Sequence, residues 1–142
     1  MGALFTEKLS TMQVQVYPSR LWVLLNGFRY YSGYRGSEYY FDMNEGFVFD
    51  GGSIPRAAWF VDAPAGDGAQ AYCLHDALYK SHLVTRLEAD RLMLEGLKEL
   101  GLNWVRRSVI YRAVRMFGWL AWRRSDPEIA SARLYIKMTD KR

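Results

Sequence analysis

The sequence predicts an α+β fold in which N-terminal antiparallel β hairpins are followed by a three-helix C-terminal half. Apolar residues alternate between residues 11 and 49, whereas after Pro55 they recur at helical spacing. The tail around residues 131–138 alternates again, which predicts a late strand. The chain has 142 residues and half of them are apolar, so we expect a single domain over residues 1–142.

The N-terminal half shows the alternation that is typical of half-buried strands. The alternating stretches are Met12-Val14-Val16, Leu21-Val23-Leu25 and Tyr39-Phe41-Met43. Asn26-Gly27 and Arg35-Gly36 lie between such stretches, and dipeptides of this kind favour tight turns. The sequence therefore predicts hairpins that turn at these two places.

Helical spacing predicts helices near residues 68–81, 86–100 and 103–123. The run Thr85-Arg86-Leu87-Glu88 has the form of a capping box, so the second helix should begin just after Thr85. Gly101 is well placed to end that helix, because glycine accepts the left-handed conformation found at helix C-termini.

Cysteine content and hydropathy limit the class of protein. Cys73 is the single cysteine of the sequence, which excludes an internal disulfide and a cysteine-based zinc cage. The N-terminal residues lack the pattern of a secretory signal, and no run approaches the roughly 20 apolar residues that span a bilayer. We therefore expect a cytoplasmic protein without a transmembrane segment.

The net charge of +4 is unevenly distributed. Residues 1–102 carry 9 basic and 12 acidic side chains, whereas residues 103–142 carry 10 and 3. This asymmetry favours an anionic partner, such as a lipid head-group surface, or a basic face that keeps the domain soluble. Nucleic acid is also an anionic partner of this kind, but it is less favoured because no nucleic-acid-binding motif accompanies the charge.

A group of polar residues lies among residues that otherwise predict hydrophobic core. On the first helix, His75 shares a face with apolar side chains, and Asp76 lies on the neighbouring stripe within one turn of Tyr79. On the second helix, Asp90 lies on an apolar stripe, which is unfavourable for a carboxylate without a partner.

His75 is the expected partner of Asp90. A carboxylate that holds one imidazole nitrogen sets the tautomer and leaves the other nitrogen available as a general base. The alternative is a buried structural pair that braces two helices. Both interpretations predict a contact between the two side chains.

The loop from Phe49 to Pro55 contains Asp50, Gly51 and Gly52, and glycines allow backbone groups to turn toward an ion. Together with Asp76, this loop would form an oxygen site suited to calcium. Alternatively, Asp50 caps the chain and the glycines simply permit a tight bend.

The third helix carries basic and aromatic side chains together. They gather opposite its apolar face, as on an interfacial membrane helix or a protein-binding surface. The residues that we expect to face a membrane or a partner are Arg107, Tyr111, Arg112, Arg115, Trp119 and Trp122.

The sequence resembles a phage and prophage family that is known only as domain of unknown function family 1353. The resemblance rests on four stretches over most of the chain, and Gly52 stands where that family more often has alanine. They are Glu45–Arg56, Leu74-His75-Asp76-Ala77-Leu78-Tyr79, Arg86–Arg91 and Ala113–Trp119. The resemblance implies a phage-related origin, so we expect the protein in the host cytoplasm or incorporated into the virion.

A second resemblance covers about a third of the chain. The order of an Asp-Gly loop, a helical His-Asp-x-x-Tyr and an Ala-Asp on the next helix is similar to bacterial and parvoviral phospholipase A2. That resemblance implies that His75 activates water and that Asp90 orients the His75 ring. It also implies that Asp76 helps to hold calcium together with the loop around Asp50. It also implies a place for Tyr79 in the site. Those enzymes use disulfides that this chain lacks.

These observations lead to two main hypotheses of different classes, and a third is a host-directed protein that binds nucleic acid through the basic third helix. In the first, the chain is a phage-encoded, calcium-dependent hydrolase of a lipid or another ester. In the second, it is a structural component of a phage head or tail, in which the His/Asp pair braces the helices and the third helix contacts another virion protein.

Overall fold

The computed structural model describes residues 4–5, 14–16, 21–51, 53–63 and 66–142. Its strands are β1 (Leu4–Phe5), β2 (Val14–Val16), β3 (Trp22–Leu24), β4 (Phe28–Tyr31), β5 (Tyr39–Met43), β6 (Val48–Phe49) and β7 (Ile136–Asp140). Its helices are the short 3-10 helix η1 (Arg56–Ala58), α1 (Ala69–Ser81), α2 (Arg86–Glu99), α3 (Trp104–Phe117), α4 (Trp119–Trp122) and α5 (Asp126–Ala132). The α+β prediction is confirmed.

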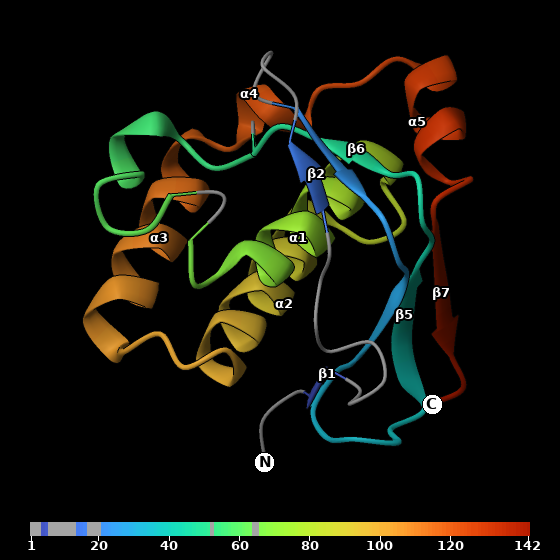
Figure 1. Ribbon diagram of the computed structural model, residues 1–142, viewed down its shortest axis with the longest axis horizontal. Helices are drawn as coiled ribbons and strands as arrows, with labels where there is room; N and C mark the ends of the chain where they lie inside the picture. The colour runs from blue at the N-terminus through green and yellow to red at the C-terminus, as the bar shows by residue number, and fades with distance from the viewer. Residues whose placement is uncertain (1–3, 6–13, 17–20, 52, 64–65) are drawn as a thin grey trace.

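The strands form two antiparallel sheets, one in the order β1-β4-β5-β7 and the other in the order β2-β3-β6. Helix α1 lies at the centre of the molecule, between the strands and α3 (Figure 1). Helix α2 packs on α1, and α3 packs on α2. Helices α1, α2 and α3 therefore form layers on one side of the strands, whereas α5 lies apart from them and contacts α1 (Figure 1).

The two sheets are connected by a hairpin that bends. Its outer part pairs Trp22 with Phe49 in one sheet, and its inner part pairs Phe28 with Met43 in the other. The turn predicted at Arg35-Gly36 joins β4 to β5 as expected. The Asn26-Gly27 dipeptide instead lies at the bend between the sheets, so the hairpin predicted there is wrong.

The alternation in β5 is confirmed, because Tyr39, Phe41 and Met43 are all buried. In β3 the buried residue is Leu24, whereas Leu21 and Leu25 at its two ends are exposed. The predicted stripe of Leu21, Val23 and Leu25 therefore lies on the less buried face of this segment, and Leu24 on the opposite face enters the core. The predicted position Met12 lies outside the described residues.

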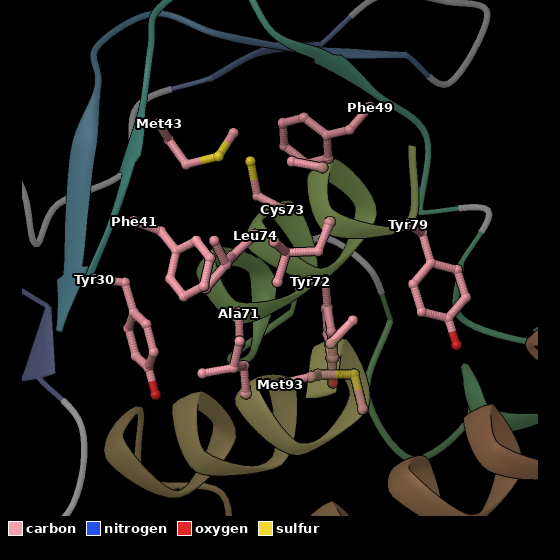
Figure 2. Close-up of a cluster of buried hydrophobic side chains, with 14 of the residues drawn as sticks. Tyr30, Phe41, Met43, Phe49, Ala71, Tyr72, Cys73, Leu74, Tyr79 and Met93 are labelled. Carbon is pink, nitrogen blue, oxygen red and sulfur yellow. The ribbon is translucent and has the colours of Figure 1, made fainter. Parts of the chain in front are cut away.

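Helix α1 supplies the centre of the hydrophobic core. Every residue from Gln70 to Tyr79 is buried, because strands cover one side of this helix and other helices cover the rest. Figure 2 shows side chains of α1 between Phe41 and Met43 of β5 on one side and Met93 of α2 on the other. A polar side chain on α1 must therefore find its partners inside the protein.

Local signals set the limits of α2. The Thr85 hydroxyl accepts a hydrogen bond from the Glu88 backbone N–H at 3.2 Å, and the helix begins at the next residue, Arg86. The helix ends at Glu99, and Gly101 follows in the left-handed region with φ of 90°. Both predicted boundaries are confirmed, and together they fix the position of Asp90 in the second turn.

The C-terminal part differs in detail from its prediction. The expected helix over residues 103–123 is interrupted at Gly118, where an added Cβ would lie 2.6 Å from the Tyr79 hydroxyl. Helix α5 was not predicted, although Ser125 and Glu128 form a capping box at its start. The late strand is present as β7 and pairs with β5. None of the helices among the described residues is long and apolar enough to cross a bilayer.

Replacing Thr85 with alanine should lower the free energy of unfolding by about 1 kcal/mol, because the cap of α2 loses its side-chain acceptor. Thr85→Ser should stay close to the wild type, since serine keeps the hydroxyl. Urea denaturation of the three proteins measures the difference. Equal losses in the two variants would contradict the cap.

Candidate functional site

His75 lies in the middle of α1 and its side chain is completely buried. Its Nε2 lies 2.7 Å from Oδ1 of Asp90 on α2, and its Nδ1 lies 2.9 Å from Oγ of Ser53. The predicted contact between His75 and Asp90 is therefore confirmed. The second ring nitrogen also has a protein partner, which the sequence interpretation did not identify.

The Asp90 carboxylate of α2 accepts hydrogen bonds from the other two long helices, α1 and α3. Oδ1 accepts hydrogen bonds from His75 of α1 and, at 2.7 Å, from the Tyr79 hydroxyl of the same helix. Oδ2 accepts a hydrogen bond from Arg115 of α3 at 2.6 Å and lies 3.8 Å from the Arg86 guanidinium. These contacts compensate for the loss of water around a completely buried charge.

These contacts determine the tautomer of His75. An ionised carboxylate can only accept hydrogen bonds, so Nε2 carries the hydrogen in the neutral imidazole. Nδ1 is then unprotonated, and it accepts the hydrogen bond that the Ser53 hydroxyl donates. The imidazole is therefore an oriented base whose basic nitrogen faces a serine.

Burial alone would raise the pKa of Asp90, but the hydrogen bonds from His75, Tyr79 and Arg115 outweigh it and hold the pKa below its usual value. Burial raises the pKa of Tyr79, and the bond to Asp90 raises it further. The phenol therefore stays protonated and remains a donor. The network holds one negative charge on the carboxylate.

Local contacts position Ser53. Gly51 adopts φ of 73°, a conformation that favours glycine, and its carbonyl accepts a hydrogen bond from the Ile54 backbone N–H at 3.0 Å. The Ile54 carbonyl accepts a hydrogen bond from the Trp59 indole at 3.1 Å, and Ile54 itself is buried. Ser53 is only 1% exposed. No feature of the sequence distinguished this serine from an ordinary loop residue.

Asp76 follows His75 on α1 and is also completely buried. The Lys80 ammonium lies 3.1 Å from its Oδ2, yet without the geometry of a hydrogen bond. Neither carboxylate oxygen has a hydrogen-bond partner among the described residues. Buried oxygens of this kind are the donors that a hard cation prefers.

The other predicted calcium ligands are less well placed. Asp50 is exposed, Gly51 is buried with its carbonyl bonded to Ile54, and Gly52 lies outside the described residues. Within the described part of the chain, no three His, Cys, Asp or Glu side chains are grouped as a metal site would require. Asp76 therefore fits a calcium ion, while the remaining ligands are not assembled around it.

Two further residues of the network come from positions that the sequence did not single out. Arg86 donates hydrogen bonds to the carbonyls of Val114 and Arg115, each at 3.2 Å, and so holds the end of α3 beside Asp90. Gly118 leaves room for the Tyr79 hydroxyl because it has no side chain. Neither the reach of the Arg86 side chain nor the space left by Gly118 produces a periodic pattern in the sequence, so neither contact could be predicted from it.

The predicted partner-facing residues divide into two groups. Arg112 and Trp119 are exposed, and Arg107 and Tyr111 are half-buried. Arg115 is half-buried, and its guanidinium bonds to Asp90, a contact that the sequence did not predict. Trp122 is also directed inward: its ring stacks on His82 at 4.0 Å and meets the Tyr79 ring edge-on at 5.1 Å.

Exposed apolar side chains on α3 and α4 define what we call the α3–α4 surface. Its apolar members are Trp104, Val105, Val109, Met116, Phe117, Trp119 and Leu120. Val105, Val109, Arg112 and Met116 share one stripe of α3, because they follow one another at helical spacing. The segment 104–122 contains four arginines and no acidic residue.

Together, these features define a small α+β protein with a buried serine–histidine–aspartate network at the junction of one loop and three helices. The family model "Protein of unknown function (DUF1353)" matches residues 22–114. The chain belongs to this family. No curated protein and no solved structure matches it.

The unfolding free energy should fall more steeply with acid in the wild type than in Asp90→Asn. The pKa of Asp90 is lower in the folded than in the unfolded protein. The contribution of its carboxylate to the free energy of unfolding is therefore fully present above the unfolded pKa of about 4, and it is lost as the pH falls through the lower folded pKa. Urea titrations at pH 6 and pH 3 compare the two proteins. Parallel losses would show that Asp90 does not contribute as described.

Proposed function

We propose that the protein is a hydrolase of a lipid or another ester in which His75 is the general base. The observation that carries this proposal is the hydrogen bond between His75 Nε2 and Asp90, which leaves Nδ1 as the basic nitrogen. A base oriented by a carboxylate can take a proton from an attacking hydroxyl group and later return it to the leaving alcohol.

Asp90 and Tyr79 act on His75 in different ways in this proposal. The Asp90 charge stabilises the imidazolium that forms when Nδ1 takes up a proton. The Tyr79 hydroxyl bonds to the same oxygen as Nε2 and keeps the carboxylate in place. Arg115 occupies the opposite oxygen, so rotation of the carboxylate would break a charged contact. All three therefore support one orientation of the ring.

Calcium is the cation that we propose for Asp76. The support comes from its two buried carboxylate oxygens, which lack hydrogen bonds from described residues. Asp76 would hold the ion together with oxygens of the loop at Asp50 and Gly51, and the Lys80 ammonium would have to move away. Bound there, calcium would polarise the carbonyl of an ester.

The protein should hydrolyse a phospholipid or an activated ester in the presence of calcium, and EGTA should reduce the rate. His75→Gln should lower kcat by at least about 100-fold, because a general base contributes roughly 10²–10⁴-fold. Asp76→Asn should remove the calcium dependence and Asp50→Asn should weaken it, whereas Glu38→Gln, which changes an exposed carboxylate outside this loop, is the control. Circular dichroism reports whether each variant is folded.

Absence of turnover on a broad panel of esters, with calcium present, would contradict the enzymatic proposal. It would favour the second candidate, a structural phage component in which the same residues brace the helices. The complete burial of His75 and Asp90 supports that candidate. In that case Asp90→Ala should cost about 3–5 kcal/mol of stability, because a buried partner is left unpaired.

The α3–α4 surface is the proposed site of contact with an anionic membrane surface. Its apolar side chains can enter the lipid interface, and its arginines can meet acidic head groups. Arg112 is exposed on the stripe of Val105 and Met116, and Arg123 stacks over the exposed Trp119 ring at 5.1 Å. The absence of acidic residues from 104 to 122 favours lipid over a basic partner protein.

The protein should co-sediment with phosphatidylglycerol vesicles and much less with phosphatidylcholine vesicles. Added salt should weaken the binding, because charge contributes to it. Met116→Glu should reduce binding several-fold, since it places a carboxylate on the apolar stripe. Leu25→Glu is the matched control, as Leu25 is exposed in the bend between the sheets. Equal binding by both variants would exclude the α3–α4 surface.

A further inference from the structure

We propose that Ser53 is the nucleophile of the hydrolase and that the reaction passes through an acyl-enzyme on its Oγ. This inference rests on the proposed function and deepens it, because it identifies the group from which His75 takes the proton. The supporting geometry is the chain of two hydrogen bonds from Ser53 Oγ through His75 to Asp90, at 2.9 and 2.7 Å. Nucleophile, base and orienting acid occur in this order in enzymes that form acyl intermediates.

A comparison with other buried serines shows that this contact is specific. Ser37, Ser53 and Ser81 are buried in the described part of the chain. The Ser37 hydroxyl donates to the Tyr39 carbonyl, which is an ordinary backbone contact, and the Ser81 hydroxyl has no partner among the described residues. Ser53 alone of these three bonds to a group that can accept its proton.

The surroundings of His75 favour this proton transfer. Nδ1 faces the Ser53 hydroxyl, and Nε2 faces the ionised Asp90 carboxylate. The other charged or titratable groups at the network are the Tyr79 phenol of α1, Arg86 of α2 and Arg115 of α3. The carboxylate is the charge in direct contact with the ring, so it compensates the positive charge that develops on the imidazole.

The reaction then has two balanced steps. Ser53 Oγ attacks the ester carbonyl while its proton moves to His75 Nδ1; the carbonyl-to-alkoxy bond breaks, and the alcohol leaves with that proton. In the second step, water gives a proton to Nδ1 and attacks the acyl carbon. The bond between that carbon and Ser53 Oγ breaks, and Oγ takes the proton back from Nδ1. No oxidant, reductant or co-substrate other than water is required.

The position of Ser53 also sets a condition on access. Its side chain is 1% exposed, so an ester reaches Oγ only when the residues that cover it move aside. Modification of Ser53 should therefore be slow for a reagent in solution. The modification of Ser53 does not require unfolding, because a small phosphorylating reagent can reach the side chain during brief local openings of the native protein.

The experiment combines burst kinetics with covalent labelling of the full-length protein. With a p-nitrophenyl ester and calcium, the wild type should release a burst of nitrophenol that approaches one equivalent per chain. Diisopropyl fluorophosphate should add one diisopropylphosphoryl group, and peptide mapping should place it on Ser53. His75→Gln should lose both the burst and the adduct.

Ser53→Ala should lower kcat by roughly 10³-fold or more and should remove the adduct. Ser81→Ala is the matched control, since it removes another buried hydroxyl near the end of α1 and should keep burst and adduct. If turnover shows no burst, persists in Ser53→Ala and is lost in His75→Gln, water attacks the ester directly. That result would overturn the inference and leave the proposed function intact. A wild type with neither turnover nor adduct would overturn both.

Discussion

The buried carboxylate of Asp90 is the constraint on which the arrangement of the helices depends. A carboxylate in this position costs several kcal/mol of desolvation unless donors surround it. His75 and Tyr79 of α1 and Arg115 of α3 supply those donors, so three helices must meet at one point. The apolar core brings the helices together without specifying their register, whereas this network specifies which residues face each other.

The constraint reaches beyond the three helices. Because Nε2 of His75 is committed to Asp90, Nδ1 points to the loop after β6, and Ser53 of that loop completes the network. The Tyr79 hydroxyl needs space, which Gly118 provides between α3 and α4. The ring of Tyr79 also meets Trp122, so α4 is held against α1 near the same point. Loop, helix ends and core therefore depend on one polar centre.

Local signals in the sequence were sufficient for the fold class, the turn at Arg35-Gly36 and the ends of α2, since each depends on residues close together in the chain. The contact between His75 and Asp90 could be predicted because a carboxylate on an apolar stripe needs a buried partner. The contact between Arg115 and Asp90 was missed because helical spacing placed Arg115 with exposed arginines, whereas its long side chain reaches Asp90. Ser53 was missed because its role depends on where a loop lies in three dimensions.

The burial of the network is compatible with both hydrolysis and bracing, but the chemistry of its members is more informative. Bracing two helices does not require an ionised group, because apolar side chains of similar volume often pack at the same place with equal or greater stability. A structural histidine could likewise donate from one nitrogen to a backbone carbonyl and accept a backbone N–H at the other. Here one ring nitrogen faces a serine hydroxyl and the other faces a carboxylate. These contacts also satisfy both nitrogens of a buried ring, but the order serine, histidine, carboxylate is the one that proton transfer to a base requires, so it favours the catalytic interpretation.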